Sequence, residues 1–330
     1  MNRQAAIDAI RNSRLARHAD SLIERLEPSV RLIVDEGPAA APVEAAGSHF
    51  GGLPSLPAAA DWPLWDKHDF LQAQIARSEE AFKKNPRATL FRDMAAKLRL
   101  QLSDGPRPLA FLGQLSLSEL HQAAPLPAWP CEGLLSFFYD ESEDAGFDPL
   151  ARGCCRVLYF PEGLRVAVTP IPAGLPEEGV FPERRLSFVR EWSLPSRIML
   201  GEECLTIWDD AYRELAGQLM PGLTSDDVQD PLHAIHRCGG HPQEIQGDMR
   251  LECQLVSNGI YCGDPSGYKD PRRASLESGA ADWELLIQID SDADRLGWMW
   301  GDMGRLYFWN RRQDLAAANF EGAWAILQGY

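Results

Sequence analysis

The sequence predicts an α+β fold made of two similar, pseudo-symmetric halves, each a mainly antiparallel sheet with peripheral helices. The first observation is a glycine turn that occurs twice, as SHFGGLP at 48–54 and as HRCGGHP at 236–242. Two further segments return in the same order, FLGQL at 111–115 as LLIQI at 285–289, and GLLSFF at 133–138 as GRLYFW at 304–309. Because repeated segments in a fixed order mark repeated structural units, we predict an internal duplication.

The repeated segments divide the chain into three regions. We expect an N-terminal helix over 1–29, a first α+β half over 30–192 and a second α+β half over 193–330. The interval after the glycine turn is longer in the first copy, and the extra residues predict a helical insertion at 64–102. Two copies are too few for a solenoid, in which three or more units close a core. We therefore expect one compact, two-lobed unit.

Hydrophobic periodicity predicts the elements, because helices bury every third or fourth residue and half-buried strands every second one. In the first two regions the predicted elements are a helix over 3–27, a strand over 30–34, two helices within 64–102, a strand over 109–115, a helical turn over 116–120, a strand over 133–139, a hairpin of strands over 154–160 and 164–169, and a strand over 185–192. In the second half they are a helix over 209–220, strands over 251–256, 283–289 and 305–309, a helix over 311–319 and a final strand over 320–328. The alanines at 316–318 and the segment 324–327 would also suit one continuous helix at this end. The acidic stretch 140–148 is expected to be a solvated loop.

Composition limits the classes of partner. The formal charge of -16 disfavours nucleic acid and anionic membrane surfaces, because phosphate binding depends on clustered Lys and Arg. Neither a signal peptide nor a run of 18 apolar residues occurs, which predicts a cytoplasmic protein that does not enter a membrane. The 7 cysteines are odd in number and scattered, so we expect reduced thiols rather than a disulfide framework.

Six short segments together point to a known family. They are FGGLP at 50–54 with Trp62 and Pro63 after it, LAFLGQL at 109–115, GLLSFF at 133–138, GGHP at 239–242, LLIQIDSD at 285–292 and WGD at 300–302. In this order they resemble the bacterial YwqG-like family, also called the domain of unknown function 1963, over roughly 30–330. The resemblance implies an α+β fold of two similar halves, and it implies no established activity or catalytic residue.

Two glutamines, Gln114 and Gln288, lie inside predicted apolar strands, where a buried amide must find hydrogen-bond partners. In a structural interpretation, each amide holds the glycine turn of its own half. In a functional interpretation, both amides face a cleft between the halves. The candidate ligand-binding residues are then Gly51, Gly52, Trp62, Gln114, Gly239, Gly240, His241, Gln288, Trp300 and Asp302. Duplicated polar residues more simply serve duplicated folds, so the sequence favours the structural interpretation.

One cluster has the side chains that bind zinc, which accepts imidazole and thiolate ligands in tetrahedral geometry. Its members are His233, His236, Cys238 and His241. The spacing matches no common zinc motif, and the first copy has Ser48, Phe50 and Leu53 at the matching positions. A structural loop with incidental histidines is therefore the favoured interpretation, and no other cofactor is expected.

The sequence favours a non-catalytic module that binds a small molecule, a peptide or a protein. Duplicated loops and 10 tryptophans support this interpretation, and the serines and cysteines have no nucleophile signature. Two alternatives remain open. One is an immunity- or antitoxin-like partner of a basic effector, which the acidic balance would attract. The other is a metal-assisted enzyme that uses the histidine cluster.

Overall fold

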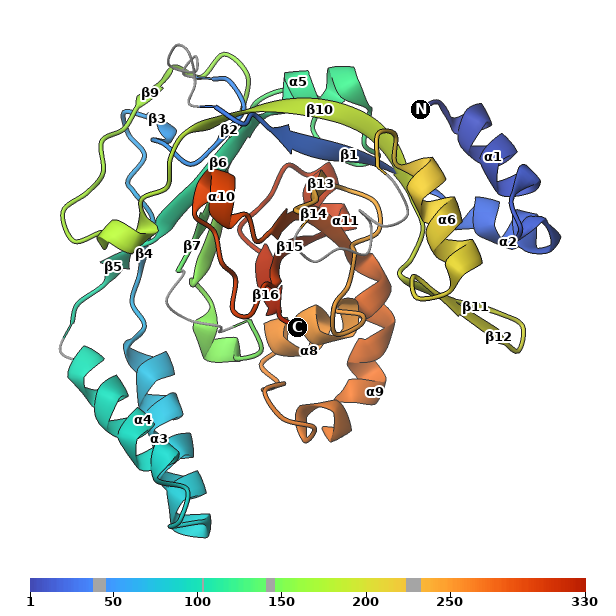
Figure 1. The fold of residues 1–330 in the computed structure, drawn as a ribbon. Coiled ribbons are helices and arrows are strands. Elements are labelled where there is room, and N and C mark those ends of the chain that lie inside the picture. Colours follow the sequence, from blue (N-terminus) through green and yellow to red (C-terminus); the bar gives the residue numbers. More distant parts are fainter. Residues whose placement is uncertain (38–45, 103, 141–145, 224–232) are drawn as a thin grey trace.

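A ten-stranded antiparallel sheet forms the centre of the protein (Figure 1). The computed structural model describes residues 1–37, 46–102, 104–140, 146–223 and 233–330, so most of the predicted acidic loop lies outside the described residues. In sheet order the strands are β16 (Trp324–Gln328), β15 (Arg305–Arg311), β14 (Trp283–Asp290), β13 (His236–Cys238), β1 (Glu27–Val34), β10 (Arg184–Ser193), β2 (His49–Phe50), β6 (Ala110–Ser116), β7 (Leu134–Tyr139) and β8 (Cys155–Phe160). The predicted α+β class with a mainly antiparallel sheet is confirmed.

The two central strands pair with segments that are far away in the sequence. Strand β1 precedes β2 in the chain, yet it pairs with β13, from Val30↔Cys238 to Leu32↔His236. Strand β10 precedes β13, yet it pairs with β2. The two strands also pair with each other along their length. The sheet is therefore continuous across the boundary that the sequence predicted between residues 192 and 193.

The sheet curls until its two ends face each other (Figure 1). Phe137 on β7 and Phe308 on β15 lie with ring centroids 5.4 Å apart. Phe50 on β2 contacts Trp298, which precedes β15, at 5.0 Å between centroids. Such edge-to-face aromatic pairs add to the burial that drives folding. The largest hydrophobic core therefore contains residues from both halves.

Helices cover the outside of the curled sheet and extend from it. Helices α3 (His68–Lys84) and α4 (Thr89–Gln101) form a projecting hairpin, as predicted for the insertion, below a small ladder of β4 (Leu64–Trp65) and β5 (Arg107–Pro108) in the view of Figure 1. The other helical elements on the sheet are α5 (Leu117–Ala123), η2 (Pro149–Ala151), η3 (Glu177–Gly179), α8 (Arg250–Ser257), η4 (Gly267–Lys269), α9 (Arg273–Leu276), η5 (Glu277–Asp282), α10 (Ala293–Leu296) and α11 (Arg312–Ala316). Among the described residues, no helix is both long and apolar enough to cross a lipid bilayer.

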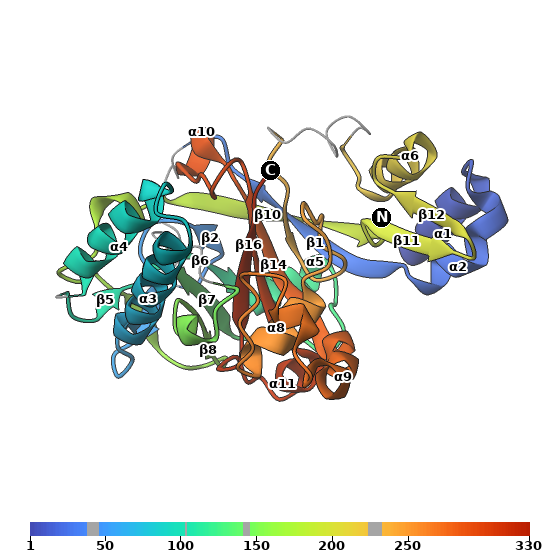
Figure 2. The ribbon, with the colours of Figure 1, turned by 90° about the horizontal axis from the view of Figure 1, so that it is seen from below.

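A separate lobe surrounds the far ends of β1 and β10 (Figure 2). We call it the N-terminal lobe. It consists of α1 (Arg3–Asn12), η1 (Ala16–His18), α2 (Ala19–Glu24), the hairpin of β11 (Arg197–Leu200) and β12 (Glu203–Thr206), and α6 (Asp210–Leu219). Ile10, Leu22, Trp192 and Leu215 are among the buried residues of its own small core. The lobe thus joins the start of the chain to the segment that follows β10.

Three sequence predictions are wrong in detail. The predicted helix over 3–27 is interrupted, because the Ser13 hydroxyl donates to Ile10 O at 2.8 Å and accepts from Leu15 N at 3.1 Å. The predicted strand over 251–256 is helix α8. Met249, which directly precedes the helix, and the buried helix residues Cys253 and Val256 recur at helical spacing and pack together in one core cluster.

The predicted hairpin over 154–169 does not form. Strand β8 pairs only with β7 among the described residues, whereas β9 (Val166–Val168) pairs with β3 (Ser55–Pro57). Thr169 N extends this second ladder by donating to Pro54 O at 2.8 Å. The turn at 161–163 therefore leads the chain away from the large sheet toward the first glycine turn.

Candidate functional site

The amide of Gln114 holds the first glycine turn. Its Oε1 accepts a hydrogen bond from Ser55 N at 2.9 Å, and its Nε2 donates to Gly47 O at 2.9 Å. Gln114 is fully buried in β6, so these bonds satisfy groups that water cannot reach. The amide thereby joins the backbone on both sides of Gly51 and Gly52.

The amide of Gln288 makes the same bonds in the second copy. Its Oε1 accepts from Gln243 N at 2.8 Å, and its Nε2 donates to Ile235 O at 2.8 Å. It is also fully buried. Both amides therefore bind the chain's own backbone, as the structural interpretation of the sequence expects.

The two glycine turns share one backbone conformation. The φ angles are +60° and +70° at Gly51 and Gly52, and +65° and +66° at Gly239 and Gly240. Only glycine adopts this left-handed region freely. A Cβ atom on Gly51 would also lie 2.1 Å from Pro182 O, which is much closer than van der Waals contact. These glycines thus permit close chain packing in the first copy.

The remaining candidate residues do not gather around the two amides. The indole of Trp62 donates to Leu109 O at 2.9 Å, and that of buried Trp300 donates to Asp290 O at 3.2 Å. Asp302 is exposed. Gln114 lies on β6 and Gln288 on β14, and four strands separate β6 from β14 in the sheet. In the part of the chain that the structure describes, neither glutamine lines any of three cavities.

The candidate zinc ligands face different partners. His236 Nδ1 accepts from Asp290 N at 3.1 Å, and its Nε2 lies 3.4 Å from Asp292 Oδ2. Cys238 lies in the core, where burial raises the pKa of its thiol. His241 Nε2 lies 2.8 Å from Arg25 O, and burial lowers the pKa of its imidazole to about 4. His233 is half-buried before β13. Among the described residues, no three His, Cys, Asp or Glu side chains form a potential metal site.

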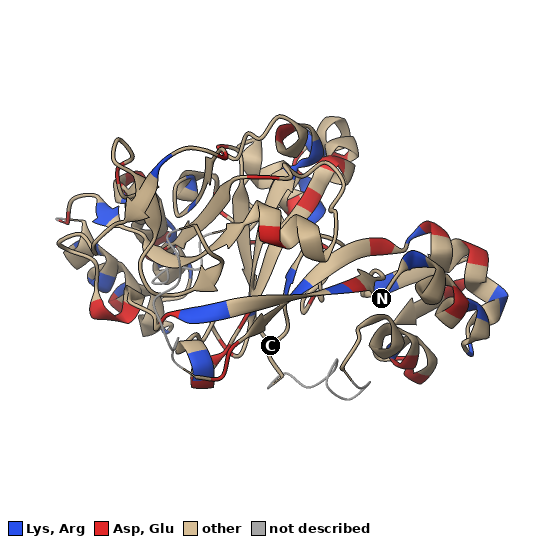
Figure 3. Cartoon of the chain, turned by 90° about the horizontal axis from the view of Figure 1, so that it is seen from above, with Lys and Arg blue, Asp and Glu red and all other residues tan. Residues whose placement is uncertain are grey.

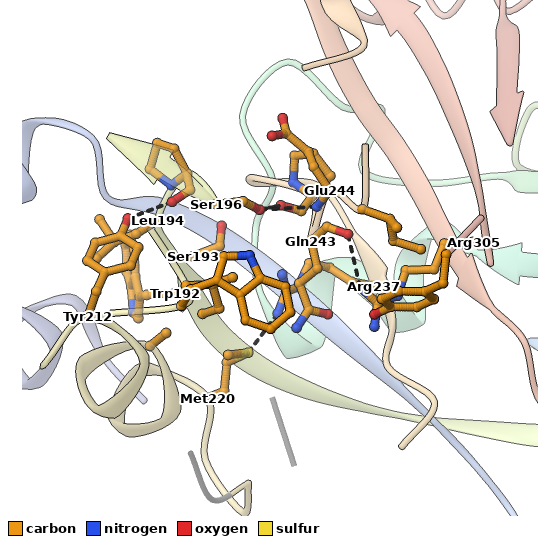
Figure 4. A pocket seen from close by; sticks show the side chains of 17 residues that line it. Trp192, Ser193, Leu194, Ser196, Tyr212, Met220, Arg237, Gln243, Glu244 and Arg305 are labelled. Carbon is orange, nitrogen blue, oxygen red and sulfur yellow. Dashed lines mark hydrogen bonds between the residues drawn. The ribbon is translucent and has the colours of Figure 1, made fainter. Parts of the chain in front are cut away.

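A pocket lies where the N-terminal lobe meets the second glycine turn (Figure 4). We call this cavity of about 120 Å³ the α6 pocket. Its lining residues come from the end of β10 and the turn after it, from α6 and its flanks, and from the loop at 242–245, together with one residue each of β13 and β15 and the last residue, Tyr330. They are Trp192, Ser193, Leu194, Pro195, Ser196, Ile207, Trp208, Tyr212, Ala216, Met220, Arg237, Pro242, Gln243, Glu244, Ile245, Arg305 and Tyr330.

The walls of the α6 pocket are mainly apolar. Tyr212 is buried, and its hydroxyl donates to Pro195 O at 2.6 Å, which fixes the ring against the turn after β10. Trp192 and Met220 are buried beside it. Trp208 differs because it is 66% exposed and therefore forms an open rim. Apolar walls with a few polar groups are typical of small-molecule sites.

A buried ion pair lies at the base of the pocket. Arg237 Nε donates to Glu191 Oε1 at 2.6 Å, and both side chains are almost fully buried. The other guanidinium nitrogens of Arg237 donate to His241 O at 3.1 Å and contact Met220 Sδ at 2.8 Å. A buried charge of this kind requires such a complete set of partners. Arg237 therefore serves as a fixed wall of the pocket.

The loop at 242–245 is held from beneath by the sheet. Gln243 O accepts hydrogen bonds from Arg305 Nη1 at 3.0 Å and from the Tyr307 hydroxyl at 2.7 Å. Gln243 N is bound to the Gln288 amide, so a predicted candidate residue supports the pocket from outside it. One wall of the pocket is thus fixed before any ligand arrives.

Glu244 carries the perturbed carboxyl of the pocket. Burial raises its pKa from 4.5 to about 7, and nearby Asp248 adds to the effect. Its backbone N donates to Ser196 Oγ at 3.1 Å. Within the part of the chain that the structure describes, no hydrogen bond or ion pair engages the carboxylate. A titratable group of this kind in a cleft is a candidate ligand contact.

The sequence interpretation missed the aromatic part of this pocket. Trp192, Trp208 and Tyr212 belong to no repeated segment, and they meet the 242–245 loop only through tertiary folding. One signal was present, because Trp208 directly precedes Asp209 and Asp210 in a polar context where a core residue is not expected. The hydrophobic periodicity after Trp208 indicated only the helix over 209–220.

Comparison with known proteins gives a family and no activity. No curated protein was found to match the chain. A family model described as Domain of unknown function (DUF1963) matches residues 48–329, which include every strand of the large sheet except β1. Because this match covers most of the 330 residues, the chain belongs to the DUF1963 family.

Proposed function

We propose that the protein is a non-catalytic binding module whose α6 pocket takes an apolar group of a small molecule or a peptide side chain. The observation that carries the proposal is the pocket itself, with Trp192 and Tyr212 in its wall. Its volume of about 120 Å³ is close to that of cavities that hold a benzene-sized ligand. The expected group is therefore a single ring or a branched aliphatic chain.

The fixed position of the loop at 242–245 supports a role of the α6 pocket in ligand binding. Gln288, Arg305 and Tyr307 hold Gln243 in place, so a ligand does not have to order this wall. The exposed indole of Trp208 extends the apolar surface beyond the cavity. The Glu244 carboxyl is available to accept a hydrogen bond from a donor on the ligand.

A screen of small aromatic and aliphatic compounds by ligand-observed NMR tests this function. Ala216→Leu adds bulk to a residue that lines the pocket, and we expect it to abolish binding of the compounds found. Ala96→Leu makes the same change on the exposed side of α4 and is the matched control. Compounds that bind Ala216→Leu and wild type equally, or a screen without any binder, would contradict the proposal.

A basic effector protein is the second candidate partner, supported by the charge of -16. Figure 3 shows acidic and basic residues interspersed on the helices of the N-terminal lobe, so the charges there do not separate by sign. We therefore favour binding in the α6 pocket over binding of a basic partner through the net charge.

We further propose a cytoplasmic location, which agrees with the free state of all 7 cysteines.

We also propose that the two halves descend from one duplicated unit. In this proposal β10, which the sequence predicted at the end of the first half, is the leading strand of the second unit and is exchanged with β1. The supporting observations are the equivalent bonds of Gln114 and Gln288, and the reciprocal pairing of β1 with β13 and of β10 with β2. An experimental structure tests the idea by superposition of residues 47–55 on 235–243. Different backbone paths in these two segments would contradict it.

A further inference from the structure

Two adjacent cysteines, Cys154 and Cys155, line a cavity of about 390 Å³ that is separate from the α6 pocket. The cavity lies where the start of β8 approaches the segment before β16, so both ends of the curled sheet border it. Cys155 Sγ donates to Ala323 O at 3.8 Å across this junction. Both cysteines are free and only 2% and 5% exposed, so the cavity is their route to small molecules.

The pKa values of the two thiols are shifted in opposite directions because the thiols interact with each other. The hydrogen bond from Cys154 lowers the pKa of the Cys155 thiol, and the positive charge of Arg156 acts in the same direction. The same hydrogen bond, together with burial, raises the pKa of Cys154. A thiolate is the nucleophile in thiol chemistry, so Cys155 is the attacking group and Cys154 is its partner.

Other buried cysteines lack this arrangement. Burial raises the pKa of Cys238 and of Cys253, each of which lies in a hydrophobic core cluster. Neither lines the cavity of Cys154 and Cys155, which is also bordered by the guanidinium-bearing residues Arg152, Arg156 and Arg311. Nearby positive charge favours a thiolate. The vicinal pair is thus chemically distinct from these core thiols.

We propose that Cys154 and Cys155 form a thiol–disulfide exchange site that a low-molecular-weight disulfide oxidises to a vicinal disulfide. The Cys155 thiolate attacks one sulfur of the small disulfide, forms a mixed disulfide and releases one small thiolate. Cys154 then loses its proton and attacks Cys155 Sγ, which releases the second small thiol. One disulfide is consumed, one is formed, and the two protein thiols supply the two protons and two electrons.

The product is easily reduced again. Consecutive Cα atoms are about 3.8 Å apart, which is less than the separation of about 4.4–6.8 Å that unstrained disulfides prefer. Oxidation also removes the S–H proton that Cys155 donates to Ala323 O, and therefore one contact between the two ends of the sheet. The site is thus a reversible redox site at the junction that closes the curled sheet.

The exposed cysteines have to be removed for a clean test. Cys131→Ser with Cys204→Ser removes the two exposed thiols and leaves the vicinal pair intact. Arg152 and Arg156 flank the pair, so trypsin releases both cysteines in the peptide 153–156. The folded double variant is treated with oxidised glutathione, alkylated and digested for mass spectrometry. We expect this peptide to lose about 2 Da, to resist alkylation and to regain both thiols after reduction.

Two further variants in this background test the two roles. With Cys154→Ser, a glutathione adduct should persist on Cys155. With Cys155→Ser, Cys154 should remain unmodified. If either serine variant fails to fold, the mass spectrometry of the Cys131→Ser, Cys204→Ser double variant alone tests the proposal. Full alkylation of both cysteines after oxidation, or an adduct that persists on either one while the other is present, would overturn it.

Discussion

Gln114 and Gln288 each join two backbone groups that lie on opposite sides of a glycine turn, Gly47 with Ser55 and Ile235 with Gln243. Each amide satisfies one donor and one acceptor that are shielded from water. Loss of the amide leaves these groups without partners, and such loss costs about 1–3 kcal/mol for each buried group.

We therefore expect Gln114→Leu and Gln288→Leu to destabilise the protein by similar amounts, about 2–6 kcal/mol each. Urea unfolding followed by far-UV circular dichroism measures the change. Gln313→Leu alters an exposed glutamine on α11 and should change the free energy of unfolding by less than about 0.5 kcal/mol. A large effect for only one of the two buried glutamines would show that the turns are not equivalent.

The first glycine turn gives a second stability prediction. Gly51→Ala forces a Cβ atom to 2.1 Å from Pro182 O, in addition to the cost of a positive φ. Gly163 has a φ of +81° and no atom within 4 Å of the position that a Cβ would take, so Gly163→Ala isolates the conformational cost of about 1–2 kcal/mol. We expect Gly51→Ala to lower the thermal midpoint clearly further. Equal shifts for the two variants would mean that Pro182 moves aside freely.

The buried ion pair below the α6 pocket gives a third prediction. Glu191→Gln leaves the Arg237 charge without its carboxylate partner and should cost about 3–5 kcal/mol. Replacing both residues, as Glu191→Leu with Arg237→Met, should restore only part of this loss. It removes the Arg237 charge, but buried Arg31, whose Nη1 lies 3.9 Å from Glu191 Oε2, still loses its carboxylate. Unfolding of the wild type, Glu191→Leu, Arg237→Met and the double variant measures the coupling, and additive effects would argue against a tight pair.

The carboxyl of Glu244 gives a pH prediction. Its folded pKa of about 7 lies above the ordinary value of 4.5, so the folded protein binds the proton more tightly than the unfolded chain. This contribution to stability is fully present below pH 4.5 and is lost as the pH rises through 7. Charged Asp248, Arg197 and Arg250 act on the same carboxyl.

Glu244→Gln removes this titration. We expect the variant and the wild type to melt at similar temperatures near pH 4.5, and the variant to melt at a higher temperature at about pH 8. Differential scanning fluorimetry across this range measures the difference. A difference that does not change between the two pH values would show that Glu244 titrates normally.

The repeated strands could be predicted because their apolar patterns are local. Gln114 and Gln288 also stood out, since a polar residue within an apolar strand requires a partner. The partners of β1 and β10 could not be predicted, because pairing depends on which edge of the sheet each strand meets. Helix α8 was mistaken for a strand because a short buried run fits both periods.

The α6 pocket was hidden for a related reason. Trp192, Tyr212 and Gln243 come from three segments without any shared motif, and only the N-terminal lobe brings them together. The two glutamines chosen from the repeats instead hold the glycine turns. Gln288 also supports the pocket indirectly, because its amide holds a loop that lines it.

The pairing of β1 with β13 and of β10 with β2 has a consequence for synthesis on the ribosome. Strand β2 pairs with β10, and β1 pairs with β13, whose residues are synthesised only after position 235. Neither half finds its correct neighbours until most of the chain has left the exit tunnel, and contacts of such long sequence separation form slowly. A nascent chain of this protein therefore carries unpaired strand edges for much of its translation.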